Sequence, residues 1–452
     1  MEKNLTTGSV LKNIAYFSLP YFMAYFLQTL YGMADLFITG QYNGTAQITA
    51  VSIGSQVMHM LTVMIVGLAM GATVAIGKSV GAGQKEKAAE TIGNTVTLFM
   101  ITSVVLTILL LVFVRPIVSV MSAPEESVAG TVQYLTICFI GIPFITAYNI
   151  ISSIFRGLGD SKSPMYFIAV ACVVNIALDY LFIGKMGMGP AGAALGTTLS
   201  QTISVIVSLT IILKQKTGIA LHKACFKPRN LVMRPILQVG VPVALQDGFI
   251  QIAFIVITII ANQRGLNDAA AVGIVEKFIS FIFLVPSSML STVSALSAQN
   301  IGAGKHDRAA LTLRYAILIC VGFGVVAAVI IQFIAEPVVG IFDSSPDVVR
   351  AGGQYLRSYI WDCVFAGVHF SFSGYFCAYG RSGISFLHNA LSIVLIRIPG
   401  AYFMSKFFAY TLYPMGLAAA AGSLLSVIIC IIAYLWMKQH NVLKNGAENE
   451  YA

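Results

Sequence analysis

The sequence contains very few charged residues. Only 10% of its 452 residues are Asp, Glu, Lys or Arg, whereas 57% are hydrophobic, and the mean hydropathy is +0.84. A soluble globule of this length could not bury so much apolar surface. The composition therefore excludes a soluble domain and predicts a membrane protein.

The sequence also lacks the signatures of an enzyme and of a disulfide-bonded secreted domain. The seven cysteines have no paired spacing, which predicts small core residues rather than a disulfide framework or a structural metal site. The chain has no His-Glu-x-x-His pattern and no recognisable nucleophile–base set, so we expect neither an enzyme nor a bound cofactor. The first apolar segment lacks a small-residue cleavage site, so it does not read as a signal peptide.

What the chain does contain is an internal duplication. The run that begins at Ser79 (SVGAGQKEKAA) returns at Asn300 (NIGAGKHDRAA), and the same shift relates Pro116 to Pro337 and Gly159 to Gly380. A duplicated half in an apolar chain is typical of membrane transporters, in which two repeats move against each other around a central site.

Apolar stretches of about 20 residues recur, the length that crosses a bilayer as a helix. The sequence predicts twelve of them, six in each half, at about 14–40, 47–77, 92–114, 130–156, 165–184, 191–213, 235–264, 268–301, 312–334, 352–380, 385–408 and 415–438. The predicted fold is therefore an all-α polytopic membrane protein with two six-helix bundles. An even number of spans per half relates the bundles by a pseudo-twofold axis along the membrane normal.

The basic residues predict the orientation. Most of the 27 Lys and Arg residues, including those of 214–234, fall on segments that share a side with the N-terminus. By the positive-inside rule both termini are cytoplasmic, and the formal charge of +9 is a topology signal rather than a nucleic-acid footprint. We expect a first lobe at 1–213, a cytoplasmic linker at 214–234 and a second lobe at 235–452, in a monomer in the cell inner (cytoplasmic) membrane.

Charged residues inside the spans are candidates for function, because each costs several kcal/mol if it faces lipid. In the first span Gln28, Tyr31 and Asp35 lie on one helical stripe, and Pro20 predicts a bend earlier in the same helix.

The fifth and sixth spans add polar stripes of the same kind. Asn175 and Asp179 are one turn apart, and so are Thr197 and Gln201. A polar seam that only joins helices would account for the amide and hydroxyl side chains. It accounts poorly for two aspartates, so a cation-binding site is the favoured interpretation.

The second half lacks these acids at the equivalent positions. Its own intramembrane charges are Asp247, Glu276, Lys277, Asp362 and Arg397, and the sequence assigns no role to Glu276, Lys277 or Arg397. Because Glu276 and Lys277 are sequence neighbours, they do not share a helix face, and we expect their partners on other helices. His59, His369 and His388 read as isolated intramembrane histidines, with packing favoured over proton handling.

The double repeat, Pro20 with Asp35, the Asn175–Asp179 pair and the paired Gly-Ala-Gly loops resemble the multidrug and toxic compound extrusion (MATE) family over nearly the whole chain. The acids of the first lobe resemble the branch named for the DNA-damage-inducible protein F. In that branch the equivalents of Gln28, Tyr31, Asp35, Asn175, Asp179 and Thr197 form a cation site, and all six residues are present. The sodium-coupled branch named for norfloxacin export uses a Glu in span 7. Ile250 occupies that position, which argues against cation coupling in the second lobe.

The resemblance implies an antiporter that exports lipophilic, often cationic, drugs by alternating access, with H⁺ or Na⁺ as coupling ion. Two carboxyls in a poorly solvated pocket cannot both ionise cheaply, so the pocket can hold a proton, a transient sodium ion or the charge of a drug, but not all at once. Candidate linings of the drug cavity are Met33, Phe37, Tyr148, Phe249, Phe281, Met289 and Asp362.

Rival functions have less support. A flippase for lipid-linked sugars or other amphipathic metabolites is the main alternative, but it needs a strongly cationic cavity, and only Lys277 and Arg397 are available in the spans. A passive channel is not favoured because the acids are not repeated in both lobes. The sequence leaves open the natural substrate, the choice between H⁺ and Na⁺, and the stoichiometry.

Overall fold

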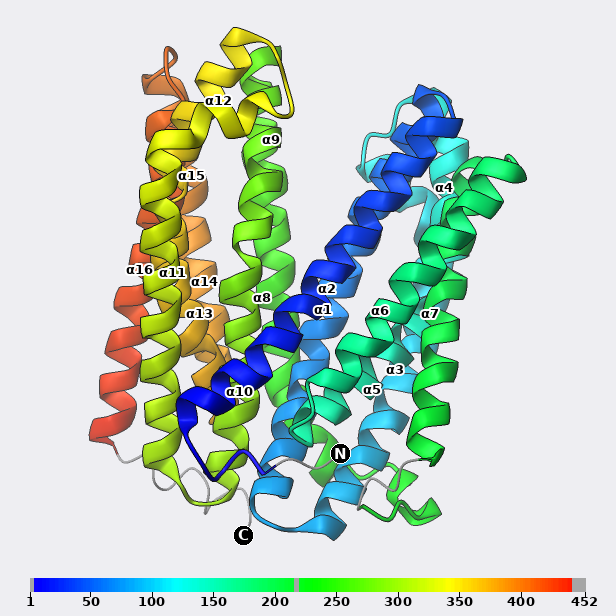
Figure 1. The fold of residues 1–452 in the computed structure, drawn as a ribbon, viewed down its shortest axis with the longest axis vertical. Coiled ribbons are helices and arrows are strands. Elements are labelled where there is room, and N and C mark those ends of the chain that lie inside the picture. Colours follow the sequence, from blue (N-terminus) through cyan, green and yellow to red (C-terminus); the bar gives the residue numbers. More distant parts are fainter. Residues whose placement is uncertain (1–3, 215–218, 441–452) are drawn as a thin grey trace. The chain divides into compact units, whose positions relative to one another are not determined.

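A computed structural model describes residues 4–214 and 219–440, and helices account for all the regular structure of these residues (Figure 1). The α-helices are α1 Val10–Tyr42, α2 Thr45–Gly81, α3 Lys85–Val120, α4 Glu125–Ile140, α5 Ile142–Gly157, α6 Lys162–Asp179, α7 Gly189–Lys214, α8 Asn230–Asn262, α9 Leu266–Ile282, α10 Leu284–Gly302, α11 His306–Gly340, α12 Pro346–Tyr359, α13 Asp362–Ala378, α14 Ser382–Ser392, α15 Ile398–Phe407 and α16 Tyr413–Gln439. Two π-helical segments, η1 Tyr180–Lys185 and η3 Ile393–Arg397, and a 3₁₀ turn, η2 Lys223–Phe226, complete the set.

These helices group into the twelve spans that the sequence predicts. Nine are long and apolar enough to cross a membrane in the described part of the chain, and α4 with α5 makes a tenth span bent by 49°. The other two predicted spans correspond to α1 and to α12 with α13. The fold is therefore the expected all-α polytopic membrane protein, and the surplus of helices arises because several spans are interrupted.

The two halves repeat the same interruptions. The fourth span of each half is broken, at Gly141 between α4 and α5 and near Trp361 between α12 and α13. The fifth span of each half contains a π-helical segment, η1 or η3. Such segments in α-helices are frequently found at functional sites. The duplication seen in the sequence therefore extends to irregular features of the backbone.

The repeated glycine loops have the same geometry in both copies. Gly83 and Gly304 have φ angles of 71° and 69°. Each ends its helix with the same pair of backbone hydrogen bonds, for example from the N–H of Gln84 to Ser79 and from that of Lys305 to Asn300. Only glycine adopts this left-handed conformation without strain, which explains why it is present in both loops.

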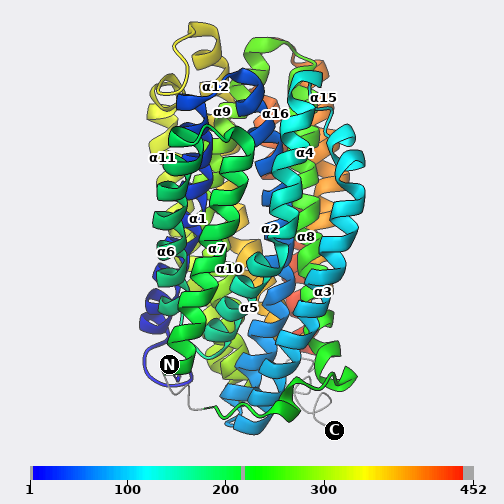
Figure 2. The same ribbon diagram turned by 90° about the vertical axis from the view of Figure 1, so that its right-hand side faces the viewer.

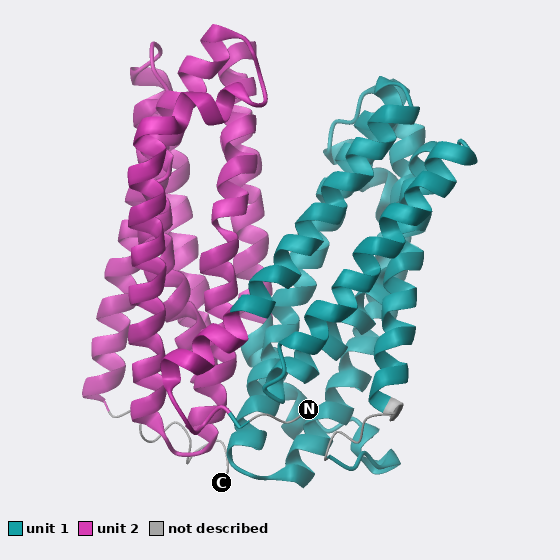
Figure 3. Cartoon of the chain, in the orientation of Figure 1, with its two compact units in different colours: residues 1–4, 19–240 teal, residues 5–18, 241–452 magenta. Residues whose placement is uncertain are grey.

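The chain divides into two compact units, residues 1–4 with 19–240 and residues 5–18 with 241–452 (Figure 3). Within the first unit α2 packs against α4 and α5, and α7 packs against α4 and α6 (Figure 2). Within the second unit α13 packs against α10, α11 and α16. Each unit has its own buried apolar clusters.

The unit boundaries differ from the lobes expected from sequence, which placed 1–213 in the first lobe and began the second at 235. Residues 5–18 pack with the second unit, where the backbone N–H of Leu5 donates to Gln299 Oε1 (3.2 Å) and Lys305 Nζ donates to the carbonyl of Thr6 (2.9 Å). The expected linker includes the start of α8 at Asn230, and α8 stays with the first unit as far as Gly240. There the Gly71 and Gly240 backbones let α2 and α8 approach closely, since a Cβ at either glycine would overlap the other helix.

The cysteines lie where the sequence analysis expects them. All seven are free thiols; six are buried and Cys225 is half-buried.

Candidate functional site

Asp35 lies on α1 in the interior of the first unit, with 2% of its surface exposed. Thr197 on α7 donates its hydroxyl to Asp35 Oδ2 at 3.0 Å. One turn later on α1, Thr39 donates its hydroxyl to the backbone carbonyl of Asp35 (2.6 Å). The carboxyl is thus held by a neighbouring helix, and no basic residue forms an ion pair with it in the described chain.

Asp179 and Asn175 of α6 lie beside the Asp35 side chain. Both are fully buried, and the side chain of Asp35 lies within interaction distance of both. Asp179 is the last residue of α6, directly before the π-helical segment η1. The structure therefore brings together Asp35, Asn175, Asp179 and Thr197 from three helices.

Gly196 makes this assembly sterically feasible. It precedes Thr197 on α7, and a Cβ there would overlap Asp179 Oδ1 and lie 3.6 Å from Asn175 Nδ2. The absence of a side chain at this position lets α7 contact the two polar residues of α6. The sequence analysis does not single out Gly196, because one glycine among the 40 in this chain carries no distinctive signal.

The cluster retains unused hydrogen-bonding capacity. Within residues 4–214 and 219–440, buried atoms without a partner of ordinary hydrogen-bond geometry include Asp35 Oδ1, both carboxylate oxygens of Asp179 and both polar side-chain atoms of Asn175. Two buried carboxylates without partners are costly as a charged pair. No group of three or more His, Cys, Asp or Glu side chains arranged for a metal ion occurs in the described residues. The donor set is two carboxyls with amide and hydroxyl oxygens, which suits H⁺ or a hard monovalent cation.

One further predicted residue, Tyr31, interacts with the cluster. Tyr31 is half-buried and interacts with Asp35 and with Gln201 of α7, which is itself buried. Gln28 is half-buried one turn earlier on α1. Pro20 lies inside α1 and is the second residue of this helix that belongs to the first unit. A change of helix bend at Pro20 stays a prediction.

The second unit contains a polar cluster of another kind. Asp362 on α13 forms a buried ion pair with Arg397, the last residue of η3, and Arg397 also reaches the hydroxyl of Tyr359 at 3.4 Å. Because a guanidinium already neutralises Asp362, this carboxyl differs from those of Asp35 and Asp179. Glu276 accepts a hydrogen bond from Thr258 on α8 (3.1 Å), so its partner is on another helix, as expected.

Two of the histidines that read as isolated are in contact. The rings of His369 and His388 lie 5.4 Å apart, and His388 Nε2 is 2.9 Å from the hydroxyl of Ser373. The expectation of isolated side chains is wrong for this pair, because packing of α13 against α14 brings together residues 19 positions apart. His59 is exposed on α2.

The candidate cavity residues fall into two groups. Tyr148 and Met289 are buried within the first and second units, which favours packing roles. Met33 and Phe37 are exposed on α1, whereas Phe249 and Phe281 are half-buried, with Phe249 edge-to-face against Phe386. Exposed aromatic and thioether groups on the first helix fit the predicted contact with lipophilic molecules. Asp247 is half-buried on α8.

The sequence model of the MatE family matches residues 20–181 and again residues 242–403. The chain belongs to the MatE family. The two matches begin at Pro20 and Pro242, so the family unit is the repeat itself. Assignment to the branch named for the DNA-damage-inducible protein F stays a prediction.

Relatives of known name cover most of the chain. It is 30% identical to a probable multidrug resistance protein, YpnP, of Bacillus subtilis over 88% of each chain. It is 25% identical to an FAD transporter of Shewanella oneidensis over 87% of each chain. The fold matches an outward-facing multidrug resistance MATE family transporter with a TM-score of 0.89 and 23% identity, covering 98% of both chains. Membership in a multi-span membrane transporter family is thereby established.

Proposed function

We propose that this MatE family protein is an antiporter that couples export of lipophilic, often cationic, drugs and toxic compounds to the entry of H⁺ or Na⁺. The proposal rests on one observation: Asp35 and Asp179 are buried beside each other. Thr197 donates one hydroxyl hydrogen bond to Asp35, and neither acid has a basic partner in the described residues. Asn175, Gln28 and Tyr31 complete the proposed cation site.

Coupling follows from competition for this acidic site. The two carboxyls in a low-dielectric interior favour a bound cation or proton, because a bare pair of charges there is costly. A proton, a sodium ion or a cationic substrate can each neutralise the pair, and once one is bound the charge no longer favours a second. Loading with the coupling ion therefore releases the drug, and occupation by the drug excludes the ion.

The energetics are sufficient for uphill export. Each elementary charge that moves inward through a membrane potential of about 100 mV contributes about 2.3 kcal/mol. For an uncharged substrate, one such charge corresponds to a gradient of nearly two orders of magnitude. For a monovalent cationic drug exchanged one for one, the charges cancel, and export is driven by the concentration gradient of the coupling ion alone.

The substrate class is supported by the exposed Met33 and Phe37 on α1 and by the names of relatives. YpnP is named as a probable multidrug resistance protein, whereas the Shewanella relative is named as an FAD transporter. A multidrug substrate range is the better supported of the two, because flexible apolar side chains accept ligands without strict geometry. We further propose a monomer in the cytoplasmic membrane. The basic residues of the linker support a cytoplasmic position for both termini.

Ion dependence of export in proteoliposomes tests the proposal. Vesicles that contain the purified protein are loaded with a fluorescent lipophilic cation and given an inward pH gradient, an inward sodium gradient or neither. Export that accelerates with one gradient, and stops when that gradient is collapsed, supports antiport and identifies the ion. Equal export under all three conditions contradicts the proposal.

A further inference from the structure

Arg156, at the end of α5, is a buried positive charge in the first unit that the proposed transport mechanism does not use. Only 7% of its surface is exposed, and Nε has no hydrogen-bond partner among the described residues. The guanidinium carbon lies 3.8 Å from the centre of the Tyr21 ring. This cation–π contact offsets only part of the cost of removing a guanidinium from water.

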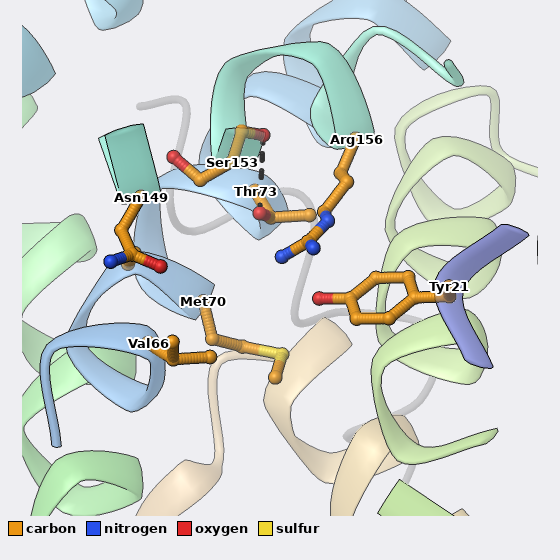
Figure 4. A pocket seen from close by; sticks show the side chains of 8 residues that line it. Tyr21, Val66, Met70, Thr73, Asn149, Ser153 and Arg156 are labelled. Carbon is orange, nitrogen blue, oxygen red and sulfur yellow. Dashed lines mark hydrogen bonds between the residues drawn. The ribbon is translucent and has the colours of Figure 1, made fainter. Parts of the chain in front are cut away.

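The group points into a small pocket. Tyr21, Val66, Ala69, Met70, Thr73, Asn149, Ser153 and Arg156 line it. In Figure 4 the guanidinium projects toward the middle of these residues, between Thr73 and the ring of Tyr21. The free space holds about one water molecule, so an occupant inserts one small group and not a whole ligand.

No acidic side chain lines this pocket. The nearest acid along the sequence, Asp160, is engaged elsewhere, because it accepts hydrogen bonds from the backbone N–H groups of Lys162 and Ser163 and from the hydroxyl of Ser163. Asn149 donates to the carbonyl of Ile145 (2.8 Å), which uses one of its two amide hydrogens. The pocket thus combines an uncompensated cation with a spare amide donor.

We propose that the Arg156 pocket binds a single oxygen atom of an anionic group, a carboxylate or a phosphate ester, whose remainder stays outside the pocket. The guanidinium donates a charge-assisted hydrogen bond to that oxygen, and the amide of Asn149 supplies a further donor. The group comes from a soluble anion, from an acidic part of a transported molecule or from a lipid headgroup. The site is separate from the Asp35–Asp179 cluster and does not depend on the direction or coupling of transport.

Thermal unfolding of the full-length protein in neutral detergent tests the site. Sodium phosphate, acetate and chloride are titrated separately, with wild type, Arg156→Gln and Arg156→Lys side by side. The matched control is Arg115→Gln, because Arg115 is an exposed arginine on α3. We expect phosphate or acetate to raise the Tm of wild type and of Arg115→Gln saturably, whereas chloride controls for ionic strength. Arg156→Gln should weaken the apparent affinity about tenfold or more, the loss of a charge-assisted hydrogen bond, and Arg156→Lys should keep part of it.

The lipid arm identifies the source of the group. The titrations are repeated in nanodiscs of phosphatidylcholine alone and with added phosphatidylglycerol. Competition by phosphatidylglycerol assigns the site to a headgroup phosphate, and unchanged affinity assigns it to a soluble anion or substrate. If no anion stabilises wild type saturably, or if Arg156→Gln responds as wild type does, the site is refuted. Arg156 is then only a cation–π tether, and the proposed antiport is untouched because this measurement involves no transport.

Discussion

Replacing Asp35 by Asn is the most informative single perturbation of the acidic cluster. The change preserves side-chain size, and the remaining carbonyl oxygen can still accept the hydrogen bond from Thr197. It removes one of the two adjacent buried carboxyls and with it the ability to bind and release a proton. Because the loss relieves repulsion from Asp179, we expect the variant to fold and to be at least as thermally stable as wild type.

The expected loss of function follows from the free energy that one ion supplies. A pH difference of about one unit is worth about 1.4 kcal/mol per proton, which corresponds to a tenfold substrate gradient. A tenfold sodium gradient is worth the same. A transporter that no longer binds the ion loses this factor entirely, so the steady-state gradient should fall from about tenfold to none.

Proteoliposomes with an imposed gradient and no membrane potential provide the assay. Asp347→Asn is the matched control, because Asp347 is an exposed aspartate at the start of α12. Asp347→Asn should accumulate substrate as wild type does, whereas Asp35→Asn should only equilibrate it. Normal gradient-driven accumulation by folded Asp35→Asn would refute Asp35 as the coupling carboxyl.

Other predictions concern the partners of this carboxyl and the second unit. Asp179→Asn should shift the pH or sodium dependence of transport, and in a double-mutant cycle with Asp35→Asn the losses should be non-additive; additive losses would place the two acids at separate sites. Gly196→Ala should lower stability by about 1–3 kcal/mol in thermal unfolding and impair ion coupling, since its methyl group overlaps Asp179, and wild-type behaviour would contradict the close approach. Asp362→Asn should destabilise by about 3–5 kcal/mol because it strands Arg397, and a second change, Arg397→Met, should restore stability. In this double variant, transport of at least one dye should still depend on the coupling ion when it is measured at two pH values, with and without sodium. If the double variant loses ion coupling for every dye while Asp35→Asn retains it, the coupling ion binds in the second unit and not in the first.

Much of the acidic cluster is predictable from sequence, because helical spacing and burial cost are local properties. Asn175 and Asp179 are one turn apart on any helix, and an aspartate in an apolar span must face a polar partner. The prediction that Asp35, Asn175, Asp179 and Thr197 form one site rests on the family resemblance.

The parts that escaped prediction depend on how distant helices pack. A side chain at position 196 is excluded only because Asp179 of another helix lies against it. The Asp362–Arg397 ion pair joins two spans, and neither span's sequence indicates that they are in contact. The burial of Arg156 against Tyr21 likewise depends on the packing of α1 beside α5. The boundaries of the two compact units differ from the expected lobes for a similar reason. Hydropathy locates spans but does not show with which bundle the ends of a long helix pack.

The division of α1 and α8 has a consequence for biosynthesis. Residues 5–18 are translated before the rest of the second unit, yet the hydrogen bond from Leu5 to Gln299 closes a loop of 294 residues, and Lys305 and Arg308 bind the same segment. The first unit, in turn, is incomplete until residues up to Gly240 have been made. The N-terminal segment must therefore wait through most of translation for its partners. Two half-chains cut in the region before α8 would each carry a piece that the other needs, so co-expressed halves should recover a fold that neither reaches alone.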